Sequence, residues 1–245
     1  MRLKNYRLDL HIHTCLSPCG DNSMVPGTII SHAKMKNLDG IGISDHNSAE
    51  NVSAVQEAAE RERLIVLGGI EITTREEIHI LGFFENNEAL FGMQAVIYEN
   101  LPGENNEEFF GEQLTVDSHD RVTGRNRRLL MGATNLSIDV IIQWIHHFKG
   151  IAIAAHIDRP SYSIVSQLGF IPEGVKLDAL ELSPHHSKVM GQYDYSLPLV
   201  TFSDAHYPDE IGKAATTFLL ETATVKELKN VLYTCDGRRV VLEHL

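Results

Sequence analysis

Histidines and carboxylates recur at the points where apolar, strand-like segments of this sequence end. They are His11 and His13 in "DLHIHT", Asp45 and His46 in "ISDHN", Glu71 in "GGIEIT", His156 and Asp158 in "AHIDRP", and Asp204 and His206 in "TFSDAH". Imidazole nitrogens and carboxylate oxygens are ligands for zinc, manganese and iron, and two histidines at i and i+2 lie on the same side of a strand. Packing alone explains five such strand ends poorly, because buried charges need partners. The pattern therefore predicts a metal centre.

The segments that carry these residues alternate with amphipathic, helix-like segments. The strand-like segments are 7–13, 39–47, 65–74, 77–84, 151–158, 177–183 and 197–206, and the helix-like ones are 26–38, 49–64, 136–150 and 222–235. Repeated βα units imply a parallel sheet, either open or closed into a barrel. The carboxyl ends of parallel strands face one rim, so residues far apart in the sequence are expected to converge there.

One insertion interrupts this alternation. Residues 86–135 begin with acidic and Asn/Gly-rich loop signals and continue as alternating strand segments around a turn. We expect a single domain over residues 1–245 with an inserted β-hairpin or cap at 86–135. The basic stretch "RVTGRNRR" in the insertion could close over an anionic substrate, although a solvated hairpin surface is the simpler interpretation.

Composition limits the class of protein. The 245 residues include 43% hydrophobic ones, enough to bury a sizeable core. The formal net charge of -12 argues against a broad surface for long nucleic acid. Three cysteines, no leader-like segment and no long apolar run predict a cytoplasmic protein without disulfides or membrane spans. Cys15 and Cys19 have no second cysteine pair to complete a zinc site, so we expect buried or loop thiols.

The motifs carry a family resemblance. "DLHIHT", "ISDHN", "GGIEIT" with "EIHILGFF", "AHIDRP" and "TFSDAH", in this order, resemble the signature of the PHP (polymerase and histidinol phosphatase) family. The resemblance extends over nearly the whole chain apart from the insertion. It implies an α/β fold, a distorted (βα)7 TIM-like barrel of the PHP type, with two or three divalent metal ions (Mn, Zn or Fe) at the carboxyl ends of its strands.

The resemblance also implies which residues bind each metal. One metal would be held by His11, His13, Glu71 and Asp204, a second by Glu71, His79 and His156, and a third by Asp21, His46 and His206. Glu71 would bridge the first two metals. Arg159, in the approximate match "AHIDRP", would bind a substrate phosphate, and His185 could reach the same rim. Asp45 would orient a ligating histidine or accept a proton.

Such a site predicts a metal-dependent phosphoesterase. Divalent ions create a bridging hydroxide near neutral pH, orient it for attack on phosphorus and neutralise phosphoryl charge. The expected partner is a small phosphorylated substrate, and the resemblance favours a phosphate monoester, a nucleotide or the ends of short oligonucleotides. No G-x-S-x-G elbow or Walker-type loop supports serine hydrolysis or nucleotide-driven transfer. Two alternatives stay open: another metal-dependent hydrolysis of the amidohydrolase type, and a non-catalytic PHP binding module.

Overall fold

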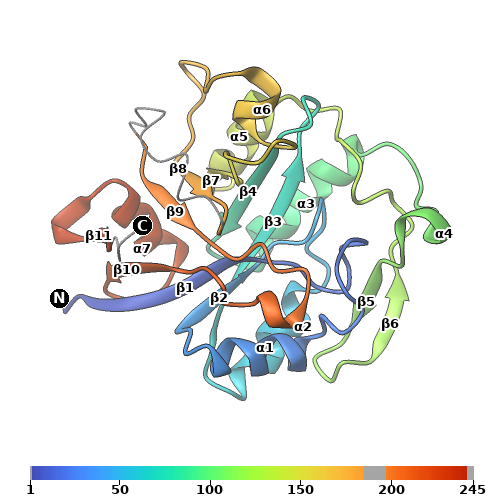
Figure 1. The fold of residues 1–245 in the computed structure, drawn as a ribbon, viewed down its shortest axis with the longest axis horizontal. Coiled ribbons are helices and arrows are strands. Elements are labelled where there is room, and N and C mark those ends of the chain that lie inside the picture. The colour runs from blue at the N-terminus through green and yellow to red at the C-terminus, as the bar shows by residue number, and fades with distance from the viewer. Residues whose placement is uncertain (1, 185–196, 242–245) are drawn as a thin grey trace.

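The computed structural model describes residues 2–184 and 197–241, and its main feature is a nine-stranded mixed sheet (Figure 1). In spatial order the sheet runs β11-β10-β1-β2-β3-β4-β7-β8-β9. The strands are β1 (Lys4–Ile12), β2 (Gly40–Ile43), β3 (Ile65–Thr73), β4 (His79–Phe84), β7 (Ile151–Ala154), β8 (Ala179–Leu182), β9 (Leu199–Thr201), β10 (Thr216–Leu220) and β11 (Arg239–Val241).

The sheet curls until its two sides nearly meet. The chain that leaves β9 returns to β1, where Ala205 forms an isolated parallel bridge with Ile12. The backbone N–H of His13 donates to the carbonyl of Ala205 at 3.0 Å, and the N–H of Ala205 donates to the carbonyl of His11 at 3.1 Å. These contacts join the two sides at the carboxyl end of β1, which confirms the predicted α/β fold with a barrel-like sheet.

Two strands run against the others: β10, which pairs antiparallel with β1, and β4. β1, β2, β3, β7, β8 and β9 share one direction, whereas β4 pairs antiparallel with both β3 and β7. Only a tight turn separates β3 from β4, closed by the Thr74 N–H donating to the Ile78 carbonyl at 2.9 Å. A parallel connection would need a crossover of a dozen or more residues. The expectation of a parallel sheet is therefore wrong at β4 and at β10, and the barrel is distorted at β4.

Helices cover the outside of the sheet, apart from the short α4 (Glu107–Phe110) of the insertion, which buries none of its residues (Figure 1). The other helices are α1 (Pro26–Met35), α2 (Val52–Glu60), α3 (Asn87–Asn100), α5 (Ile138–His147), α6 (Ile164–Leu168) and α7 (Val225–Leu232), with 3-10 turns at Pro208–Glu210 and Cys235–Gly237. Buried apolar residues from strands and helices form the core. The fully buried ring of Phe83 lies against Gly42 and Gly69, where an added Cβ would come within 2.7 and 2.5 Å of that ring. Both strand glycines therefore make room for this aromatic side chain.

The 86–135 segment contains more regular structure than its loop-like composition indicates. Asn86 caps α3, since its side chain accepts a hydrogen bond from the Ala89 N–H, and the helix buries Leu90, Met93 and Ile97 against the barrel. Their helical spacing explains why the acidic and Asn-rich first half forms a helix. The second half forms the hairpin of β5 (Leu114–Val116) and β6 (Val122–Arg125). In the part of the chain that the structure describes, no helix is long and apolar enough to cross a bilayer.

Candidate metal centre

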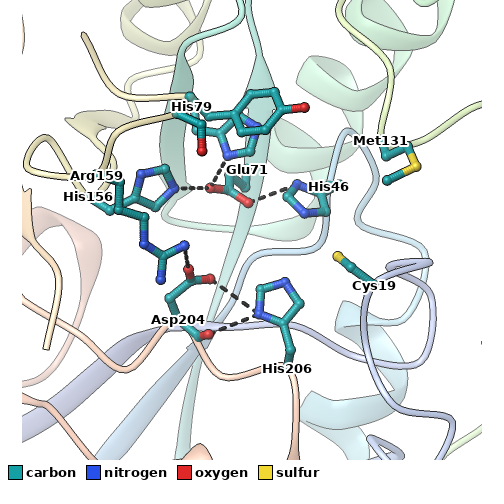
Figure 2. Close-up of a pocket in the computed structure, with 11 residues that line it drawn as sticks. Cys19, His46, Glu71, His79, Met131, His156, Arg159, Asp204 and His206 are labelled. Carbon is teal, nitrogen blue, oxygen red and sulfur yellow. Dashed lines mark hydrogen bonds and ion pairs between the residues drawn. The ribbon is translucent and has the colours of Figure 1, made fainter. Parts of the chain in front are cut away.

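The carboxyl ends of the parallel strands and the amino end of the antiparallel β4 surround one pocket (Figure 2). Its lining residues are Cys19, His46, Glu71, His79, Met131, His156, Arg159, Ser161, Tyr162, Asp204 and His206. Beside this pocket lie His11 of β1 and His13, the residue that directly follows the strand, on the face opposite to Leu10 and Ile12, as strand alternation requires. Both histidines are fully buried. The fold therefore gathers eight of the nine predicted metal ligands in one place.

The first group consists of His11, His13 and Asp204. The Nε2 atoms of the two histidines are 3.2 Å apart, and Asp204 Oδ1 lies 3.1 Å from that of His13 and 3.2 Å from that of His11. All three side chains are buried, and their ligand atoms lie within 4.8 Å of one another. Two imidazole nitrogens and a carboxylate at this spacing form a set of donors suited to a divalent metal.

Glu71 is the centre of the second group. Its Oε1 lies 2.8 Å from His79 Nδ1 and 3.4 Å from His156 Nε2, and its Oε2 lies 2.9 Å from His46 Nδ1. Glu71 is 1% exposed, yet among the described residues neither carboxylate oxygen has a partner with hydrogen-bond geometry, nor do Nδ1 of His46 and His79. Buried polar atoms without hydrogen bonds are costly. A bound cation would satisfy them all, so the residues present fit a metal centre.

Groups behind the ligands fix which histidine nitrogens face the site. Nδ1 of His11 lies 3.0 Å from both carboxylate oxygens of Glu181, and Nδ1 of His13 lies 3.0 Å from Ser17 Oγ. Ser17 donates its own proton to Asp45 at 2.7 Å, so its oxygen accepts from His13. Both histidines therefore carry a proton on Nδ1 and turn Nε2 toward Asp204 and Glu71. Such outer partners orient metal-ligating histidines.

Electrostatic interactions and burial shift the pKa values of the titratable groups in the cluster in different directions. Burial alone would raise the pKa of Glu71, but the histidines around it outweigh burial and hold that pKa well below its usual range. Burial would lower the pKa of His11, but the carboxylates of Glu181, Asp204 and Glu71 raise it well above the usual range. Burial lowers the pKa of His79 to about 4. The site thus combines ionised carboxylates with both protonated and neutral imidazoles.

The other predicted site residues lie in different surroundings. Asp45 is buried and accepts from the Thr14 N–H and from the Thr14 and Ser17 hydroxyls, so it reaches His13 only through Ser17. Arg159 is 38% exposed at the pocket and its Nη1 lies 2.5 Å from Asp204 Oδ2. Asp21 is not among the lining residues, because its carboxylate accepts hydrogen bonds from Ser23. His185 lies outside the described residues.

Sequence reasoning missed several residues of this site, among them Glu181, Tyr162 and Met131. Glu181 was hidden inside an apolar strand, although a buried carboxylate in such a strand signals a partner. Tyr162 lines the pocket and stacks on His79, with ring centroids 4.6 Å apart, and Met131 from the insertion lines the same pocket. Tyr162, His156 and Asp204 also adopt positive φ values of 56°, 28° and 49°. Such backbone conformations cost energy in non-glycine residues and cluster at functional sites.

The basic residues of the insertion do not line the pocket. Arg121 pairs with Asp117, Arg125 pairs with Glu112, and Arg128 lies over the ring of Tyr98 at 3.9 Å. Local partners therefore occupy these three side chains.

Solved structures share this fold. A lesion-specific endonuclease, PfuEndoQ from Pyrococcus furiosus, is 18% identical with a TM-score of 0.74, and the match covers 98% of this chain and 58% of the endonuclease. The chain thus spans little more than half of that protein. A proposed metal-dependent phosphoesterase from Bifidobacterium adolescentis is 21% identical (TM-score 0.53; 81% and 87% covered), and an amidohydrolase from Chromobacterium violaceum is 18% identical (TM-score 0.54; 84% and 89% covered).

Family models match most of the sequence. A comparison with curated proteins found no match. The PHP-associated model matches residues 194–232, and the PHP domain model matches residues 9–195, which include "DLHIHT", "ISDHN" and "AHIDRP". This match confirms the family resemblance, and the chain belongs to the PHP domain family.

Proposed function

We propose that this protein is a metal-dependent phosphoesterase that hydrolyses a phosphate monoester, a nucleotide or a short oligonucleotide. The observation that carries the proposal is the environment of Glu71. A buried carboxylate with no hydrogen-bond partner among the described residues faces nitrogens of His46, His79 and His156 within 3.4 Å. Neither packing nor hydrogen bonding accounts for this cluster, whereas divalent ions would.

Two or three divalent ions (Mn, Zn or Fe) would occupy the cluster. The residues proposed to hold them are His11, His13, His46, Glu71, His79, His156, Asp204 and His206. When bound, such ions activate water and neutralise the charge that develops on a transferring phosphoryl group. The chain itself orients the ligands through Glu181 and Ser17, with Asp45 acting as a positioning residue behind Ser17.

The pocket favours a small anionic group as substrate. Its volume is about 200 Å³, below the range of about 300–1,000 Å³ that is typical for drug-sized ligands. Arg159 brings a partly exposed guanidinium to this pocket, and guanidinium groups bind phosphate oxygens in a bidentate manner. We therefore propose that Arg159 binds the substrate phosphate.

Charge favours nucleotide or oligonucleotide ends over long duplexes. The formal net charge of -12 gives little attraction for an extended phosphate backbone. The endonuclease of similar fold has a structure with a 27-mer duplex that carries an abasic lesion at its active site. That match covers 58% of the endonuclease chain, so duplex binding by this protein does not follow from the likeness.

Metal analysis combined with a substrate panel tests the proposal. Protein purified without chelator is analysed for metal, then assayed on phosphate monoesters, 3',5'-bisphosphorylated nucleotides, short oligonucleotides, amides and lactones. We expect bound metal and turnover on one phosphate class, with loss of turnover in Glu71→Gln and unchanged turnover in the matched surface variant Cys235→Ser. Turnover on amides or lactones alone would favour the amidohydrolase alternative. A folded protein that binds no supplied metal would favour the non-catalytic module.

A further inference from the structure

The loop after β1 brings a thiol to the metal centre. Cys19 lines the same pocket as His46 and His206. In Figure 2 its sulfur points toward the space between these two rings. Cys15, four residues earlier, is instead fully buried against Leu114 and Val116, away from the pocket. The two cysteines of the same loop therefore have different surroundings.

Asp21, the ligand that the family resemblance implies beside these histidines, turns away. Its Oδ1 accepts from the Ser23 N–H at 2.8 Å and from the Ser23 hydroxyl. Its backbone N–H donates to the carbonyl of His206 at 2.9 Å, which fixes the loop against the end of the barrel. Gly20 makes this turn possible, because an added Cβ would lie 2.7 Å from the carbonyl oxygen of Thr14. The loop thus directs Cys19, and not the carboxylate of Asp21, into the pocket.

The histidines next to Cys19 already form a group that could hold a cation. One nitrogen each from His13, His46 and His206 lies within 4.8 Å of the others. His206 Nδ1 lies 3.0 Å from the carbonyl of Asp204 and donates to it, which leaves Nε2 available. His46 is 8% exposed, and its Nδ1 lacks a hydrogen-bond partner among the described residues. That nitrogen lies 2.9 Å from Glu71 Oε2, which also lacks a hydrogen-bond partner among the described residues, so a cation in this pocket would satisfy both atoms, and Cys19 lines the same pocket.

We propose that Cys19 is a metal ligand together with His46 and His206, in the place that the resemblance gives to Asp21. Thiolate is a soft ligand that suits zinc and iron, whereas manganese prefers carboxylate, carbonyl and water. This position therefore selects zinc or ferrous iron over manganese. The inference rests on the proposed metal-dependent function and names the ligand that decides the metal at one position.

Cobalt substitution tests the ligand directly. The chain without metal is titrated with Co²⁺, and absorption is recorded in the near ultraviolet, where sulfur-to-cobalt charge transfer appears only when a thiolate binds the ion. We expect the band in the wild type and in the control variant Cys235→Ser, because the exposed thiol of Cys235 lies outside the pocket. In Cys19→Ser we expect loss of the band and of one bound cobalt per chain. A band that persists in Cys19→Ser, or cobalt binding without a band in the wild type, would overturn the assignment.

Thiol labelling gives a second measurement that does not depend on Cys19→Ser. In the Cys235→Ser background, Cys19 is the one exposed thiol of the described chain and should react with a thiol reagent in the absence of metal. Zinc should protect it, whereas equal labelling with and without bound zinc would count against ligation.

Phosphate hydrolysis without a charge-transfer band would overturn only the role of Cys19. A band without hydrolysis of any phosphate would support Cys19 and overturn the proposed function.

Discussion

Glu181→Gln isolates the contribution of the groups behind the metal ligands. The Glu181 carboxylate is fully buried, lies 3.0 Å from His11 Nδ1 through both oxygens and accepts from the backbone N–H of His156 at 3.0 Å. Glutamine keeps the volume but removes the charge and one acceptor oxygen. The substitution therefore weakens the hold on two proposed ligands while leaving both ligands in place.

The expected loss of metal affinity follows from these contacts. Removing an outer partner of a metal-ligating histidine costs about 10- to 100-fold in affinity, or about 1.4–2.7 kcal/mol. Because Glu181 supports His11 by its side chain and His156 by its backbone, we expect the middle of this range or above, at least about 2 kcal/mol. The measurement is a zinc titration against a chromophoric chelator, with circular dichroism to verify that the variant is folded.

Asp178→Asn is the matched control. Asp178 is also a buried carboxylate paired with a histidine, with Oδ2 2.9 Å from His146 Nε2 and 2.7 Å from the Ala152 nitrogen, but it does not line the metal pocket. Its loss should lower the free energy of unfolding by about 1–3 kcal/mol and leave zinc affinity unchanged. The positioning role of Glu181 would be refuted if Glu181→Gln bound zinc as tightly as the wild type. It would also be refuted if zinc affinity fell equally in Glu181→Gln and Asp178→Asn.

Three further expectations concern the ligands and the substrate. His13→Ala should lower bound metal and abolish turnover while far-ultraviolet circular dichroism stays unchanged, and full turnover would contradict its assignment as a ligand. Arg159→Ala should raise KM for phosphorylated substrates roughly 10- to 100-fold, as expected for a lost hydrogen bond between charged groups, and unchanged kinetics would remove Arg159 from the site. Zinc binding should release protons. Neighbouring carboxylates raise the pKa of His11 and His46 well above the usual range despite burial, whereas a bound metal needs the unprotonated nitrogens of these histidines. Affinity should therefore fall as pH falls, and calorimetric titrations that give the same heat in buffers of different ionisation enthalpy would contradict this.

The site could be predicted from the sequence as far as strand periodicity reaches. His11 and His13 must share one face of β1 because successive strand residues alternate, and the carboxyl ends of parallel strands must meet at one rim. That reasoning anticipated a common location for Glu71, His156 and Asp204, which come from distant parts of the chain. The direction of β4 did not follow from periodicity, because apolar alternation looks the same in parallel and antiparallel strands.

The sequence by itself therefore determined the family, the barrel class and the ring of histidines and carboxylates, since these depend on local alternation and motif order. Only the tertiary structure decided that Glu181 lies against His11, 170 positions away in the chain. Only the tertiary structure decided, too, that Cys19 rather than Asp21 turns toward His46 and His206. In a loop the direction of a side chain depends on contacts from elsewhere, here the bond from the Asp21 N–H to the His206 carbonyl, and no periodicity encodes such a contact.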